Sequence, residues 1–139
     1  MGNDFVHMEL ATGDVAGAKT FYKSLFAWKL KQMGADMGNY VLIDTGSKDS
    51  GGGMMGKMSP EQPTAWMPYV LVASVKKSIA KAESLGAKIV MAYQPIPGVG
   101  AIGVFIDPAG AALGVYERSA KPAPAKKAAK KAKKAKKKR

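Results

Sequence analysis

Residues 5–10 read Phe-Val-His-Met-Glu-Leu, and residues 67–72 read Met-Pro-Tyr-Val-Leu-Val. In the first stretch Val, Met and Leu alternate with Phe, His and Glu, which is the period of a β-strand with two different faces. A helical pattern begins shortly after each stretch. The only histidine of the chain, His7, corresponds to Tyr69 when the two stretches are aligned with a shift of 62 residues. Such an internal repeat predicts a duplicated fold.

The elements that follow come in the same order in both halves. Helical spacing of apolar residues predicts helices over 14–26 and 75–85. The segment 58–65 is polar and carries two prolines, so we expect it to link a first module at 4–57 to a second at 66–118. The pattern indicates an α+β domain of two helices and eight strands. Strands are predicted for residues 4–10, 28–33, 40–44, 51–56, 66–73, 89–93, 101–106 and 112–116.

The composition fits one globular domain, because 139 residues with a hydrophobic fraction of 47% can bury a sizeable core. The absence of cysteine excludes disulfides, thiolate metal ligands and a cysteine nucleophile. No apolar stretch approaches the ~20 residues that a membrane span needs. The N-terminus has no basic region followed by an apolar run, which a secretory signal would require. We therefore expect a soluble, cytoplasmic protein without a membrane span.

The positive charge lies almost entirely at the C-terminal end. The formal net charge is +12, and residues 119–139 hold ten lysines, Arg139 and no acidic residue, which accounts for +11. We expect this segment to be a disordered tail, because lysines three and four residues apart repel one another. It should bind the phosphates of DNA or RNA without reading sequence, which would make the protein nucleoid-associated. A solubilising extension that binds nothing in particular is the alternative.

The tail residues expected to contact polyanions are Lys126, Lys127, Lys130, Lys131, Lys133, Lys134, Lys136, Lys137, Lys138 and Arg139. In composition alone, this run of Lys, Ala and Pro resembles the tails of linker histones and of some bacterial nucleoid proteins.

Residues 4–117 resemble the vicinal-oxygen-chelate superfamily, which includes glyoxalase I, bleomycin-resistance proteins and extradiol dioxygenases. The matching motifs are the spacing from His7 to Asp14, the aromatic residues around 21–28, Leu-Gly-Ala at 85–87 and Asp-Pro-Ala-Gly at 107–110. The resemblance implies two βαβββ modules that form a curled mixed sheet around one cup. It also implies a homodimer and a small-molecule ligand.

Metal enzymes of the superfamily place ligands on the first strand of each module and on the last strand. Those places fall on His7, Tyr69 and Gly114, of which only His7 is a good metal ligand. Glu117 is three residues from Gly114, and an odd offset on a strand points to the other face. We therefore expect no cofactor. Weak binding of a divalent ion by His7 with Glu9 or Glu117 is the alternative.

This pattern resembles an uncharacterised branch of the superfamily, in which the first strand continues with x-Glu-Leu and the last motif with Gly-Ala-x-x-Gly. Residues 7–10 and 110–114 fit that version. Membership in the branch implies no particular activity.

His7 and Glu9 are the candidate catalytic residues, since they share one face of a strand about 6–7 Å apart. Alternatively, His7 is held by its neighbours without chemistry, and Glu9 fixes a nearby backbone or tyrosine. The residues expected to line a ligand pocket are His7, Glu9, Trp28, Met54, Tyr69, Gly114 and Tyr116.

Three functions remain open at this stage. The first is a metal-independent small-molecule-binding domain with a polyanion-binding tail. The second is a lyase, isomerase or dioxygenase that recruits a metal weakly. The third is a nucleic-acid-associated protein that acts through its tail, in which the globular part plays no role in binding.

If the tail binds nucleic acid, affinity should fall as salt rises, with a logarithmic slope approaching about 0.9 per phosphate contact. Deletion of residues 119–139 should abolish binding. Fluorescence anisotropy with a labelled DNA duplex at several salt concentrations measures both effects. Binding that survives the deletion would contradict the prediction.

Overall fold

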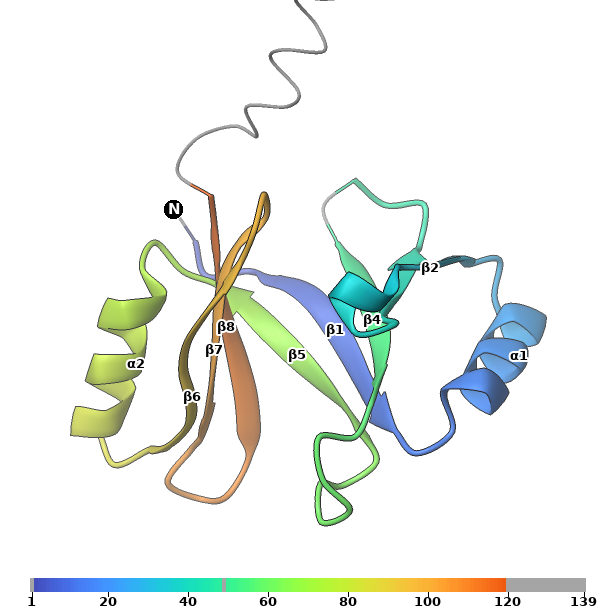
Figure 1. Ribbon diagram of the computed structural model, residues 1–139. Helices are drawn as coiled ribbons and strands as arrows, with labels where there is room; N and C mark the ends of the chain where they lie inside the picture. The colour runs from blue at the N-terminus through green and yellow to red at the C-terminus, as the bar shows by residue number, and fades with distance from the viewer. Residues whose placement is uncertain (1, 49, 120–139) are drawn as a thin grey trace, which may run out of the picture.

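The computed structural model describes residues 2–48 and 50–119, so the predicted tail contacts from Lys126 onward lie outside the described residues. Eight strands and two helices follow one another, with a short 3₁₀ turn at Ala35–Met37. The strands form one mixed sheet, and the two helices flank it (Figure 1). The bounds are β1 Phe5–Thr12, α1 Val15–Leu25, β2 Lys29–Gln32, β3 Val41–Asp44, β4 Gly51–Gly56, β5 Ala65–Leu71, α2 Val75–Ser84, β6 Lys88–Ile96, β7 Gly100–Ile106 and β8 Ala112–Arg118.

The predicted α+β fold with one curled sheet is confirmed. The strand order is β2-β3-β4-β1-β5-β8-β7-β6, so each half of the chain contributes four adjacent strands. β1 is parallel to β4, and β5 is likewise parallel to β8. The halves meet through the antiparallel pair β1 and β5, which cross the centre of the molecule in Figure 1.

His7 and Tyr69 are direct partners in the register between β1 and β5. Along an antiparallel pair, the residue number rises on one strand as it falls on the other, so the difference between the numbers of paired residues changes at every step. Residues related by the repeat always differ by 62 in number. Only one pair of residues can therefore be both strand partners and equivalent in the repeat. His7 and Tyr69 therefore lie on the approximate twofold axis that relates the two halves.

Two hydrophobic clusters hold the helices against one face of the sheet. The cluster under α1 contains Leu10, Val41, Ile43 and Met54, and the cluster under α2 contains Val72, Val75, Ile79 and Val115. Because neighbouring residues of a strand point to opposite faces, His7 and Glu9 lie on the face away from both helices. We refer to this face as the inner face.

β2 and β6 are the two outer strands of the sheet. β2 has only four residues, and β6 has two register shifts against β7. The sequence predicted a strand over 89–93, but β6 continues through Pro95 to Ile96. Proline is tolerated there because β6 has a strand neighbour on one side only, so a missing N–H leaves the ladder intact.

Glu117 connects β8 to the start of α2. Its Oε1 accepts a hydrogen bond of 2.8 Å from the backbone N–H of Val75, and Ser74 Oγ accepts one of 3.2 Å from Lys77 N–H. A carboxylate at a helix N-terminus satisfies a free N–H and interacts favourably with the helix dipole. Glu117 therefore faces the helix side of the sheet, as its odd offset from Gly114 predicted.

Replacing Glu117 with alanine should destabilise the domain by about 0.5–2 kcal/mol, the usual cost of losing a side chain that caps a helix. Glu117→Gln keeps an oxygen acceptor and should lose less. Urea denaturation of both variants and of the unmodified chain measures the difference. An alanine variant as stable as the unmodified chain would show that the contact contributes nothing.

Candidate functional site

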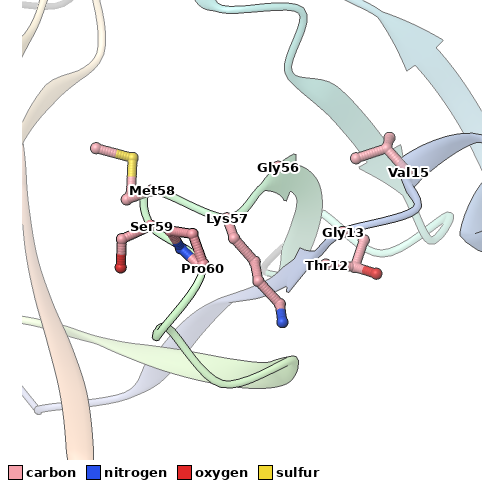
Figure 2. Close-up of a pocket in the computed structure, with 8 residues that line it drawn as sticks. All are labelled: Thr12, Gly13, Val15, Gly56, Lys57, Met58, Ser59 and Pro60. Carbon is pink, nitrogen blue, oxygen red and sulfur yellow. The ribbon is translucent and has the colours of Figure 1, made fainter.

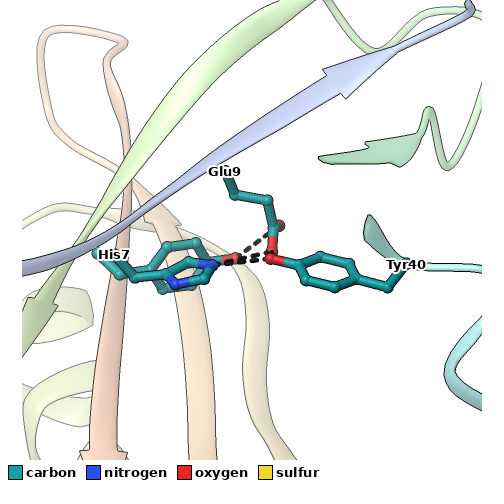
Figure 3. A network of polar contacts seen from close by, with 4 residues as sticks. His7, Glu9 and Tyr40 are labelled. Atoms are coloured by element: carbon teal, nitrogen blue, oxygen red, sulfur yellow. Dashed lines mark hydrogen bonds and ion pairs between the residues drawn. The ribbon is translucent and has the colours of Figure 1, made fainter. Parts of the chain in front are cut away.

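Four polar side chains meet on the inner face at the twofold axis (Figure 3). Nε2 of His7 lies 2.7 Å from Oη of Tyr40. Tyr40 Oη donates to Oε2 of Glu9 at 3.0 Å, and Tyr69 Oη donates to Oε1 of Glu9 at 3.1 Å. His7 Nε2 and Glu9 Oε2 are 3.8 Å apart. The carboxylate of Glu9 therefore joins residues of both modules into one network.

Glycine beneath each tyrosine makes room for this network. Gly53 is the partner of Glu9 in β4, and a Cβ at Gly53 would overlap the hydroxyl of Tyr40. Gly114 is the partner of Tyr69 in β8, and a Cβ there would overlap the Tyr69 ring. The two tyrosine rings therefore occupy space on the inner face that longer side chains would otherwise fill.

Burial sets the protonation of the cluster. It raises the pKa of Glu9, and the hydrogen bonds from Tyr40 and Tyr69 act in the opposite direction. It also lowers the pKa of His7, so the neutral imidazole is favoured. The pKa of each tyrosine is raised, first by burial and then by the charge of Glu9. Both tyrosines therefore keep their protons and act as donors to the carboxylate.

The donor set does not fit a catalytic metal. Within the described ranges, no three residues of the types His, Cys, Asp and Glu come together. Nε2 of His7 and both oxygens of Glu9 are already engaged by tyrosine hydroxyls. The other two expected ligand places hold Tyr69 and Gly114, and Glu117 lies on the opposite face of the sheet. A divalent ion normally needs three protein ligands in such a site.

The remaining predicted pocket residues fall into two groups. Gly114 and Tyr116 lie on the inner face, and Tyr116 Oη donates to the carbonyl of Val99 at 3.1 Å. Met54 is fully buried in the cluster under α1, and Trp28 packs against the same cluster. The structure therefore brings Gly114 to His7, Glu9 and Tyr69, but it places Trp28 and Met54 on the helix side.

Tyr40 was not among the predicted site residues. Tyr40, Leu42 and Asp44 alternate with the buried residues Val41 and Ile43, which shows that Tyr40 faces away from α1. The sequence does not reveal this alternation, because Leu42 is as apolar as Val41 and Ile43. Spacing along the chain also does not give the order β3-β4-β1, which brings Tyr40 close to His7.

A surface hollow of about 640 Å³ lies elsewhere. It lies between the end of β1, the end of β4 and the linker, where Lys57 extends toward Thr12 (Figure 2). His7 and Thr12 are five residues apart on β1, or about 16 Å. A second groove of about 410 Å³ runs between α2 and β6. Neither hollow includes the cluster on the inner face.

The raised pKa of Glu9 predicts a pH dependence of stability. Between its ordinary value of 4.5 and its higher folded-state value, the folded protein binds more protons than the unfolded chain, so stability falls as pH rises through this window. Glu9→Gln removes the titration. The stability of the variant relative to the unmodified chain should therefore improve between about pH 4.5 and neutral pH.

The free energy of unfolding of each protein, measured in urea at about pH 4.5 and at neutral pH, tests this prediction. Because His7 Nε2 lies 3.8 Å from Glu9 Oε2, the two titrations are coupled, and the same comparison in a His7→Ala background isolates Glu9. A difference between the two proteins that does not change with pH would contradict the assignment of a raised pKa.

Three comparisons identify proteins similar to this chain. Residues 4–46 match the family model described as bleomycin resistance protein-like N-terminal. The curated protein CFP32, whose name assigns it provisionally to the glyoxylases, is 27% identical over 114 residues in both Mycobacterium bovis and Mycobacterium tuberculosis. The match covers 79% of this chain and 44% of CFP32, so the chain spans less than half the length of these relatives.

Solved structures share the fold at low sequence identity. The hypothetical protein BH1468 from Bacillus halodurans has a TM-score of 0.65 and 14% identity, with 87% of this chain and 98% of that chain covered. Methylmalonyl-CoA epimerase from Mycobacterium tuberculosis has a TM-score of 0.62 and 14% identity, with 83% and 87% covered. A Streptomyces coelicolor methylmalonyl-CoA epimerase in complex with 2-nitronate-propionyl-CoA has a TM-score of 0.62 and 12% identity, with 85% and 96% covered.

The fold agrees with the match of the first module to the bleomycin-resistance-like family and with the similarity to CFP32. None of the helices in residues 2–48 and 50–119 is both long and apolar enough to cross a bilayer. Together these findings support the expected resemblance of the chain to the vicinal-oxygen-chelate superfamily.

Proposed function

We propose that this chain is a glyoxalase- and bleomycin-resistance-like domain that binds a small molecule on the inner face of its sheet without a divalent metal. The observation that carries the proposal is the network of His7, Tyr40, Glu9 and Tyr69. Two of its members, His7 and Tyr69, stand at places where the resemblance implies metal ligands, and both are engaged in hydrogen bonds within the network.

His7 offers a contact point for such a ligand. Its side chain is 27% exposed, and the described residues provide no hydrogen-bond partner for Nδ1. Every buried side-chain nitrogen or oxygen among these residues has a partner, so Nδ1 must reach solvent-accessible space. A ligand on the inner face can therefore form a hydrogen bond with Nδ1 while Nε2 stays bound to Tyr40.

We further propose that residues 119–139 bind polyanions. The support is the charge distribution, since these residues contribute +11 of the net +12 while the rest of the chain is almost neutral. We expect polyanion binding by these residues to be independent of ligand binding on the inner face, because their charge does not depend on it.

Metal analysis tests the first proposal. Protein purified without chelators and dialysed against Zn²⁺ or Mn²⁺ should retain no more metal than His7→Ala does, because the network supplies too few free ligands. Elemental analysis gives the ratio of metal to protein. One tightly held ion per chain that is lost in His7→Ala would overturn metal independence.

Thermal shift measurements address ligand binding. Suitable probes are bleomycin and methylmalonyl-CoA, which are named for the family model and for structural relatives. A probe that binds should raise the melting temperature equally with EDTA and with Mn²⁺, and His7→Ala should reduce the shift. Asp36→Asn, on the exposed 3₁₀ turn, is the matched control. A shift that occurs only with added metal would contradict the proposal.

A further inference from the structure

Two glycines of the inner face, Gly51 and Gly114, are related by the approximate twofold axis. Gly51 is the partner of His7 in β4, and Gly114 is the partner of Tyr69 in β8. Since His7 and Tyr69 correspond in the repeat, their glycine partners correspond as well. Neighbouring strand partners point to the same side of a sheet, so both glycines lie on the inner face. Each half of the molecule therefore has the same space beside the axis.

The two spaces are filled differently. A Cβ at Gly114 would overlap the ring of Tyr69, so this ring occupies the space in the second module. Apart from its chain neighbours, a Cβ at Gly51 would approach only one described atom within 4 Å, the backbone oxygen of Ile43 at 3.4 Å. The ring of His7 does not reach over Gly51. The first module therefore leaves open a space that the second module fills with an aromatic ring.

The open space has a cost for the fold. Glycine inside a strand weakens it, because glycine loses more conformational freedom on folding and has no side chain to pack. At Gly53 and Gly114 this cost makes room for the rings of Tyr40 and Tyr69. At Gly51 no side chain of the described residues uses the room. A bound molecule would use it.

The groups that border this space are uncharged. Leu42, the partner of Gly53 in β3, faces the same side and is 41% exposed. His7 lies on the other border, and burial lowers its pKa, which favours the neutral imidazole. The floor is the backbone of Gly51. A flat apolar ring fits such a floor closely, and a ring beside an imidazole gains from aromatic pairing.

Nδ1 of His7 accepts hydrogen bonds when Glu9 is ionised. The hydroxyl of Tyr40 has a single proton. It points to Oε2 of Glu9, because two lone-pair-bearing oxygens would otherwise face each other at 3.0 Å. The contact of 2.7 Å between Tyr40 and His7 then places a proton on Nε2. A neutral imidazole carries one proton, so Nδ1 is left to accept from a ligand.

We propose that the space above Gly51 is a subsite for an uncharged aromatic ring that donates one N–H or O–H hydrogen bond to Nδ1 of His7. The ring takes the place in the first module that Tyr69 takes in the second. This inference rests on the proposed function and deepens it, because it names the class of ligand that the inner face accepts and the residues that select it.

Indole and 1-methylindole test the hydrogen bond. They share one ring system, but only indole has an N–H. In ¹H–¹⁵N spectra of ¹⁵N-labelled protein, indole should shift the amide signals of Gly51 and Gly53 and the Nδ1 signal of His7, the only histidine. Titration gives the dissociation constant. We expect 1-methylindole to bind about three- to tenfold more weakly, the usual net effect of one hydrogen bond.

Gly51→Val tests the space. Its side chain should fill the subsite and weaken indole binding at least about tenfold, because the ring then has no room. Its melting temperature should not fall, since strands favour valine and only the backbone oxygen of Ile43 lies near. Gly51→Ala adds a single methyl group and should weaken binding less.

Gly56→Val is the matched control. Gly56 lies on the same strand, but its odd offset from Gly51 turns it to the other face, and a Cβ there would meet nothing within 4 Å. This variant should bind indole as the unmodified chain does.

The subsite is wrong if indole does not bind, if both indoles bind equally, or if Gly51→Val binds indole as tightly as Gly56→Val. A protonated Nδ1 in the ligand-free chain near neutral pH would also overturn it. The thermal shifts with bleomycin and methylmalonyl-CoA do not involve indole. A shift that depends on His7, together with a failure of indole, would reject the subsite and leave the proposed function intact.

Discussion

The antiparallel pairing of β1 with β5 is the contact on which the rest of this structure depends. It joins two halves that would each bury only one face of a four-stranded sheet, and it sets His7 opposite Tyr69. Because this pair lies on the twofold axis, one residue from each half reaches the same point on the inner face. A shift of this register by one residue would place His7 and Tyr69 on opposite faces of the sheet and would separate Glu9 from Tyr69.

On the inner face, neutral hydrogen-bond donors surround one carboxylate. Glycine at 53 and 114 leaves space that is filled by tyrosine rings from β5 and from the residue before β3. The carboxylate of Glu9 then has a hydrogen bond on each oxygen, which reduces the cost of burying it. Among the described residues, the network leaves Nδ1 of His7 without a hydrogen-bond partner.

Much of the fold could be predicted from the sequence. The alternation of residues along strands and the signals that start helices are local patterns, and the repeat is found by comparing two stretches of the same chain. The helices over 14–26 and 75–85 are confirmed within one residue at each end. The extension of β6 through Pro95 was missed, since the tolerance of an outer strand for proline depends on which neighbours it has. Strand order is a property of the whole chain, and local patterns do not contain it.

The site was predictable only in part for the same reason. His7, Glu9 and Tyr69 could be assigned to one face from their parity and from the repeat. Tyr40 required the order β3-β4-β1, and the positions of Trp28 and Met54 required knowing which face of the sheet α1 covers. The odd offset of Glu117 from Gly114 was enough to place its side chain on the helix side, where it binds Val75.

The sheet is not closed, so β2 and β6 each leave a row of backbone groups without a strand partner. Such borders invite extension by another chain and, in the worst case, fibril growth. Here one border is only four residues long and carries Lys29 and Lys31, and the other is distorted by irregular register and interrupted by Pro95. The open sheet thus leaves its inner face accessible, and its two edge strands offer little template for aggregation.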